Sequence, residues 1–168
     1  EGKATRFNEG QVRAMGRTAR GVRGINLAVG NKLISLIVPR EGGRILTVTE
    51  NGYGKRSENA EFPAKGRGGK GVIAMSTSER NGSLVGAVQV WDGDEMMLIS
   101  NQGTAVRTRV DEVSLLGRNT QGVRVIRTRD GEALVSVSRI AEDDDAAEPA
   151  QPVVTDEYSD SGSNETEE

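Results

Sequence analysis

The groups best suited to chemistry are glycines and cations that cluster in three short segments. We call them the first box (MGRTARGVRGI, residues 15–25), the second box (KGRGGKGVIAM, 65–75) and the third box (LGRNTQGVRVI, 116–126). Glycines leave backbone N–H groups uncovered and let the chain approach an anion closely, while Arg and Lys neutralise its charge. The boxes therefore predict loops that contact phosphate groups, although a single box is equally well explained as a solvated turn.

The second box contains a loop that also resembles nucleotide-binding motifs. This loop consists of Lys65, Gly66, Arg67, Gly68, Gly69, Lys70 and Gly71. Its G-x-G-x-x-G spacing marks a dinucleotide site only between a strand and a helix, whereas the strand-like VIAM follows it here. A Walker A loop needs Ser or Thr directly after Gly-Lys, and Gly71 occupies that place. A kinase-type loop needs a catalytic HRD segment, and this chain contains no His. No nucleotide cofactor is predicted for this chain.

Composition excludes several kinds of enzyme. The 168 residues contain no His and no Cys, which removes imidazole bases, Ser-His-Asp triads, thiolate nucleophiles and zinc–thiolate sites. The acidic turn at residues 92–95 lacks the twelve-residue ligand pattern of a calcium loop. Tyr53 lies in an expected turn and Tyr158 in an acidic tail, and neither has a setting for catalysis. We predict no catalytic residue and no metal site.

The boxes are the best-matched part of a longer internal repeat, and they are spaced by 50 and 51 residues. The positions that coincide are Gly16, Gly66 and Gly117; Arg17, Arg67 and Arg118; Gly21, Gly71 and Gly122; and Val22, Val72 and Val123. Upstream, Gly2, Gly52 and Gly103 keep the same register, as do Arg6, Arg56 and Arg107. Downstream, an apolar run follows each polar turn: LISLIV (33–38), LVGAVQV (84–90) and LVSVSRI (134–140). Such repetition indicates an array of similar structural units.

Each unit has the pattern of short strands. ILTVT (45–49) and MMLIS (96–100) are rich in apolar and β-branched residues and lead into turns. About four strands in each unit predict an all-β, propeller-like array of blades with units at about 1–50, 51–101 and 102–140. The first unit lacks a counterpart of ILTVT before residue 1. We therefore expect the last three blades of a larger wheel, with a piece of the chain missing on the N-terminal side.

The charge is divided sharply along the chain. All 22 Lys and Arg precede residue 140, so residues 1–140, with 14 acids, carry +8, while residues 141–168 carry 11 acids and no cation. This tail has too few large apolar groups to form a core and is expected to be disordered. The partition predicts a polyanion partner and a tail that competes with it. Alternatively, the tail serves only solubility. No apolar run approaches the roughly 18 residues of a membrane-spanning helix.

Together these segments resemble the family of DNA gyrase A C-terminal domains. The resemblance covers residues 1–140 and is carried by SLIVPR (35–40), TENGYGKRSENAEFPAKGRGGKGV (49–72) and VRTRVDEVSLLGRNTQGVRVIRT (106–128). Members fold as a β-pinwheel whose neighbouring blades exchange strands. Their best-known motif is Q-R-R-G-G-K-G in the first blade. Residues 67–71 match it, whereas Lys65 and Gly66 depart from it, which suggests the degenerate box of a late blade.

The resemblance implies a DNA-bending and DNA-wrapping module of an ATP-dependent type II topoisomerase that negatively supercoils bacterial DNA in the cytoplasm. The module itself is expected not to cleave DNA, because the catalytic tyrosine of the family lies in an upstream domain. ATP and Mg²⁺ are expected to be used by gyrase B and the catalytic core, within a heterotetramer that holds a second copy of gyrase A. Two alternatives are the C-terminal wheel of topoisomerase IV and a propeller-like protein-interaction module.

The outer surface of the wheel is expected to hold duplex DNA by its backbone, without reading its sequence. The body has few aromatic residues, which disfavours stacking on single strands. The predicted DNA-binding residues are Arg17, Arg20, Arg23, Lys55, Arg56, Lys65, Arg67, Lys70, Arg107, Arg109, Arg118, Arg124 and Arg127.

Overall fold

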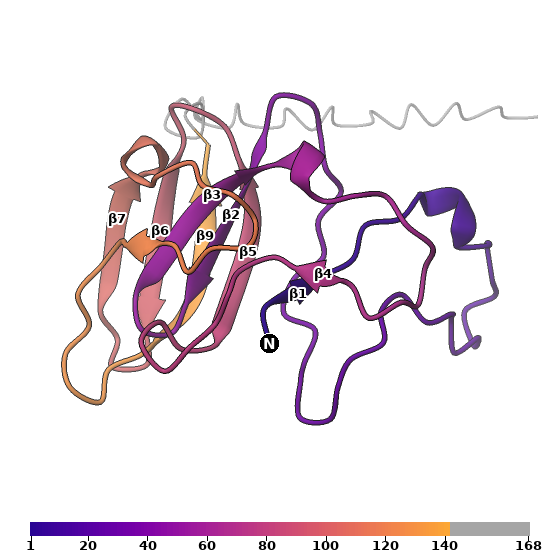
Figure 1. Cartoon of the computed structure of the whole chain (residues 1–168), viewed down its shortest axis with the longest axis horizontal. Coiled ribbons are helices and arrows are strands. Elements are labelled where there is room, and N and C mark those ends of the chain that lie inside the picture. Colours follow the sequence, from indigo (N-terminus) through magenta and orange to yellow (C-terminus); the bar gives the residue numbers. More distant parts are fainter. Residues whose placement is uncertain (142–168) are drawn as a thin grey trace, which may run out of the picture.

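A computed structural model describes residues 1–141, and the predicted acidic tail lies outside these residues. Its strands are short and antiparallel, and three 3₁₀ turns are its helical elements in the described part (Figure 1). The strands are β1 (Lys3–Ala4), β2 (Arg44–Thr49), β3 (Tyr53–Glu58), β4 (Val72–Ile73), β5 (Leu84–Val90), β6 (Glu95–Ser100), β7 (Ala105–Arg109), β8 (Val123–Arg124) and β9 (Leu134–Ile140). The 3₁₀ turns are η1 (Glu9–Gln11), η2 (Asn59–Glu61) and η3 (Val110–Glu112). The predicted all-β class is confirmed.

Two sheets form the larger part of the structure. One has the order β5-β2-β3-β8 and the other the order β7-β6-β9, while β1 and β4 pair separately among loops (Figure 1). The β2–β3 and β6–β7 hairpins occupy equivalent positions of the repeat. Each hairpin turns at a glycine with positive φ, Gly52 at 78° and Gly103 at 80°, a conformation that favours glycine. The expected strands 45–49 and 96–100 are thus confirmed within β2 and β6.

Neighbouring units exchange strands. Box strand β8 pairs with β3 of the preceding unit, with Tyr53 opposite Arg124 and Gly54 opposite Val123. The equivalent strand β4 pairs with β1 in the same way. A box therefore completes the sheet of the unit before it. The positions of the unit boundaries stay a prediction.

The main core lies between the two larger sheets. Leu46, Val48, Val90, Met96, Leu98, Val110, Val113, Leu134 and Val137 form one buried cluster. Most of these residues come from β2, β5, β6, β9 and η3, so burial of apolar area holds the two larger sheets together. A smaller cluster joins Ile45 of β2 to Phe62 and Ala74. No helix in residues 1–141 has the length and apolarity to span a membrane.

The apolar run at 33–38 does not form a strand in the structure, in contrast to its equivalents β5 and β9. Leu36 is 88% and Val38 76% exposed. The equivalents pair with β2 and β6, whereas residues 33–38 pair with no strand of the described residues. Because a strand needs a neighbour for its backbone hydrogen bonds, the apolar pattern alone did not make one here. A strand at 33–38, expected from the strand pattern of each unit, is therefore absent from the described residues.

Candidate nucleic-acid interface

The first and second boxes lie against each other although they are about fifty residues apart in sequence. The Gly68 N–H donates a hydrogen bond to the Gly24 carbonyl at 2.7 Å. The Arg67 guanidinium donates to the Arg23 carbonyl at 2.9 Å. The two loops therefore lie side by side, and Arg23 and Arg67, which are both exposed, are in contact.

The recurring spacing of glycines within the boxes has a structural reason inside the protein. Gly71 has φ +75°, and a Cβ on it would lie 2.5 Å from the Ala4 carbonyl oxygen. Gly122 also has φ +75°, and its Cβ would lie 2.6 Å from the Gly54 oxygen. At both positions the box touches the backbone of the preceding unit, so a side chain would collide with it. These two glycines serve the contact between units rather than an open phosphate cradle.

The third box is anchored by a buried lysine from the preceding unit. Lys55 is fully buried, and its ammonium donates hydrogen bonds to the Gly117 carbonyl at 2.8 Å, to Thr120 Oγ1 at 3.2 Å and to the Arg118 carbonyl. Burial lowers the pKa of Lys55 to about 8, against the opposing effect of the Glu61 carboxylate. The prediction that Lys55 contacts DNA on the outer surface is wrong, because its charge points into the protein and holds the box.

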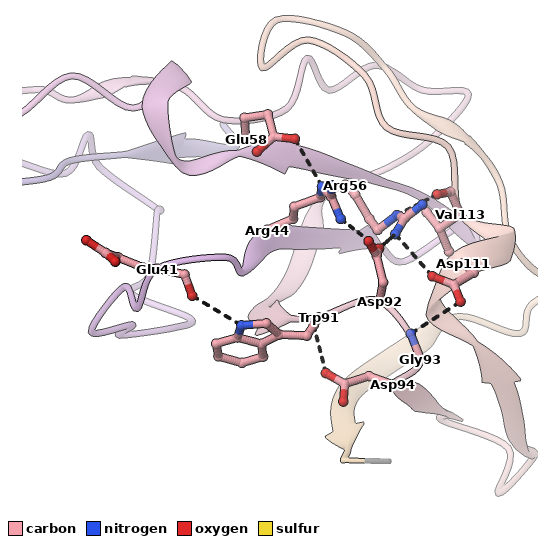
Figure 2. A network of polar contacts seen from close by, with 10 residues as sticks. All are labelled: Glu41, Arg44, Arg56, Glu58, Trp91, Asp92, Gly93, Asp94, Asp111 and Val113. Carbon is pink, nitrogen blue, oxygen red and sulfur yellow. Dashed lines mark hydrogen bonds and ion pairs between the residues drawn. The ribbon is translucent and has the colours of Figure 1, made fainter.

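Arg56 is also withdrawn from the surface, into a network that joins the two larger sheets (Figure 2). Its Nη1 lies 2.8 Å from Asp92 Oδ1 and 3.5 Å from Asp111 Oδ1, and its Nε donates to the Val113 carbonyl at 2.8 Å. Asp92 also binds Arg44 at 2.6 Å, and this hydrogen bond lowers the pKa of the Asp92 carboxyl. The Arg56 side chain is only 12% exposed. Its charge is compensated by Asp92 and Asp111, so Arg56 is not proposed to bind DNA.

Two further predicted arginines are partly engaged within the protein. Arg118 is half-buried, and its guanidinium donates to the Ile73 carbonyl at 2.6 Å and to the Glu61 carbonyl at 3.1 Å. Arg107 is exposed but forms an ion pair with Glu95 across the β6–β7 ladder. Within residues 1–141 the Arg118 guanidinium forms no ion pair, although the Glu61 carboxylate accepts a hydrogen bond from the Arg118 backbone N–H. Arg107 shares its charge with an acid.

The other predicted cations all lie on the surface. The exposed ones besides Arg107 are Arg17, Arg20, Arg23, Lys65, Arg67, Lys70, Arg109, Arg124 and Arg127. Within residues 1–141, none of these nine forms an ion pair with an acid. Sequence reasoning missed Arg80, which is exposed and lies beside Arg124 on Tyr53. The repeat register carried a signal for it, because Arg80 and Arg129 both directly precede a polar turn.

A comparison with known protein families identifies the family of this chain. The sequence profile described as "DNA gyrase C-terminal domain, beta-propeller" matches residues 1–40, 43–90 and 94–141. The chain belongs to the DNA gyrase C-terminal domain family. Its four-stranded sheet with an exchanged strand is the architecture expected from that resemblance.

Individual relatives agree with the gyrase C-terminal domain family. The DNA gyrase A protein of Pseudomonas aeruginosa is 60% identical over 141 residues, which are 84% of this chain and 15% of that protein. The structure of a DNA gyrase A C-terminal domain matches with a TM-score of 0.77 at 33% identity, over 83% of this chain and 48% of that one. A topoisomerase IV C-terminal domain matches with a TM-score of 0.79 at 25% identity, over 85% of this chain and 45% of that one. The chain therefore spans about a seventh of the length of its full-length relative, and identity favours gyrase over topoisomerase IV.

Proposed function

We propose that this chain binds and bends duplex DNA through the DNA backbone, as part of a DNA gyrase A protein. The observation that carries the proposal is the contact between the first and second boxes, which brings together Arg23 and Arg67, two exposed cations that form no ion pair with an acid within residues 1–141. Phosphate contacts from Lys and Arg release counterions and so supply binding free energy without reading bases. Bending 20–30 base pairs by 40–90° costs about 1–6 kcal/mol, which several such contacts are able to offset.

The parent protein in this proposal is an ATP-dependent type II topoisomerase that negatively supercoils DNA in the bacterial cytoplasm, on the chromosome. Family membership and the 60% identity to a DNA gyrase A protein support it. The chain would supply DNA wrapping to a heterotetramer with a second copy of gyrase A and with gyrase B, which would use ATP and Mg²⁺. DNA cleavage would belong to a region of the parent outside this chain.

The binding proposal is tested by the salt dependence of affinity for a labelled 40-base-pair duplex. With about five phosphates neutralised, the slope of log K against log salt is expected to be about −4 to −5. Replacing Lys65, Arg67 and Lys70 together by Gln should reduce the steepness by about one unit per lost contact. Lys32→Gln, at an exposed lysine outside the predicted set, is the matched control. A slope near zero would reject the proposal.

One observation favours a protein-interaction module as a second candidate. The run at 33–38 exposes Leu33, Leu36 and Val38, and an exposed apolar patch is typical of a protein-binding site. The repeat explains the same exposure more simply, because the equivalent runs are the paired strands β5 and β9. A gel shift separates the candidates, since a protein-interaction module would leave duplex DNA unshifted at low salt.

A further inference from the structure

Tyr53 joins two arginines that come from different segments of the chain. The Tyr53 hydroxyl accepts a hydrogen bond from Arg80 Nε at 3.2 Å and another from Arg124 Nη2 at 2.8 Å. Both guanidinium groups also lie over the ring, with their Cζ atoms 5.1 and 5.3 Å from its centroid. Tyr53 itself is only 3% exposed, whereas both arginines are exposed. A buried aromatic platform thus holds two surface cations.

The backbone on both sides of this platform is fixed. Arg124 faces Tyr53 directly in the β3–β8 ladder. The Arg80 carbonyl accepts a hydrogen bond from the Asn51 side chain at 3.3 Å. The next residue, Asn81, is fully buried, and its amide donates to the Gln121 carbonyl of the third box at 3.2 Å. Neither arginine therefore has to be ordered at the moment a ligand binds, which saves conformational entropy.

The charges of this arrangement are not balanced within the described residues. The two N···O distances of 3.2 and 2.8 Å limit the separation of the donating nitrogens to 6.0 Å. Among residues 1–141, no acid forms an ion pair with Arg80 or Arg124. The hydrogen bonds from Arg124 and Arg80 lower the pKa of the Tyr53 hydroxyl, as expected where positive charge gathers. Two like charges so close repel each other unless an anion lies between them.

The donors that remain suit a phosphate group. A guanidinium has five N–H donors in a planar fork, and each arginine uses one of them on Tyr53. Phosphate oxygens accept hydrogen bonds from such forks in pairs. The combination does not recur in the other two units. The positions equivalent to Tyr53 and Arg80 hold Lys3 and Val29 in the first unit, and Thr104 and Arg129 in the third unit.

We propose that Arg80 and Arg124, held by Tyr53, form a preorganised pair that binds one backbone phosphate of duplex DNA where the second and third units meet. The pair joins Arg124 of the third box to Arg80, which lies outside the boxes, and the proposal rests on the proposed DNA binding. Arg80 and Arg124 touch the phosphate, while Tyr53 acts as a positioning residue.

The first test is DNA affinity of full-length variants at several salt concentrations. The double variant Arg80→Gln/Arg124→Gln should make the slope of log K against log salt less steep by about 0.9, which is the contribution of one phosphate contact. At 0.1 M salt this loss corresponds to binding that is about 8-fold weaker. Arg80→Lys/Arg124→Lys keeps both charges but loses the planar forks, and it should also weaken binding. Lys32→Gln is the control for loss of a surface charge elsewhere. Wild-type affinity in both double variants would overturn the proposal.

The second test isolates the positioning role. Tyr53→Phe keeps the ring but removes the hydroxyl, so it should weaken DNA binding several-fold while both charges remain. NMR of the arginine Nε–H groups during titration with inorganic phosphate should show shifts at Arg80 and Arg124 in the wild type and smaller ones in Tyr53→Phe. If the wild type fails to bind DNA, the proposed function fails, and the phosphate titration still decides on the pair. Phosphate shifts no larger at these two arginines than at Arg13 would overturn it.

Discussion

The buried ammonium of Lys55 leads to a prediction about how stability changes with pH. Lys55 binds three acceptors in the third box, yet burial lowers its pKa from 10.5 to about 8. In the folded protein it therefore loses its proton near pH 8, whereas in the unfolded chain it keeps the proton until about pH 10.5. Between these values the unfolded chain binds more protons, so the free energy of unfolding contributed by Lys55 rises with pH.

The size of this effect follows from the shift. Each pKa unit corresponds to about 1.4 kcal/mol, so the full shift sets a limit of about 3.4 kcal/mol. The acceptors lie on a surface loop that solvent reaches, and we reduce this limit by about half for screening. The free energy of unfolding of the wild type, minus that of Lys55→Met, should therefore rise by about 1–2 kcal/mol between about pH 7 and pH 10.

Urea denaturation followed by Trp91 fluorescence measures both proteins across this pH range. Other titrating groups are common to the two proteins and cancel in the difference. Lys70→Met, at an exposed lysine of the second box, reports the effect of removing a lysine charge at the surface. A difference that stays constant, or that falls as pH rises, would refute the reasoning, because it would mean that burial does not penalise the Lys55 charge.

Three further predictions concern the turns, an acidic contact and the tail. Gly52→Ala places a Cβ 2.3 Å from the Ile126 oxygen at φ +78°, and it should lower the free energy of unfolding by more than about 2 kcal/mol in thermal denaturation. Gly131→Ala, at φ +72° with open space around it, should lower it by about 1 kcal/mol. Equal losses in the two variants would contradict this prediction. Hydrogen bonds lower the pKa of Glu132 from 4.5 to about 2, and the largest effect comes from the Ser100 hydroxyl. The stability that Glu132 contributes above pH 4.5 should therefore disappear as the pH falls through about 2. In Glu132→Gln the free energy of unfolding should not fall in this pH range, in contrast to the wild type. If the free energy of unfolding of both proteins falls in parallel with pH, this prediction is contradicted. Removal of residues 141–168 should tighten DNA binding at low salt if the tail competes for the cations, and unchanged affinity would dismiss that competition.

Much of the fold followed from local sequence signals. The repeat register and the Asn-Gly turn predicted the hairpins because a turn with positive φ between apolar runs is a short-range feature. The strand exchange could not be derived from local signals, since β8 is two residues long and pairs with β3 about seventy residues earlier. The run at 33–38 has a strand-like composition, but strand formation also depends on a partner.

The candidate site was predicted less completely, because charge pattern alone does not give the direction of a side chain. Lys55 and Ser57 lie on the face of β3 that the third box covers, where backbone carbonyls replace water as acceptors. A lysine in a strand normally indicates a solvated face, so the sequence pointed the wrong way. Arg80 was missed since its significance depends on Tyr53, a contact between residues 27 positions apart.

The most direct test of the central claim is to map which backbone amides of the full chain respond to duplex DNA. NMR spectra at low salt should show changes in the backbone amide signals of residues 16–23, 65–70 and 117–127 when a 40-base-pair duplex is added. A shorter duplex, which forms a smaller complex with better-resolved signals, should give the same changes. These changes should disappear together as salt is raised, because they depend on phosphate contacts. Changes confined to the exposed apolar run at 33–38, or changes that persist at high salt, would contradict the account.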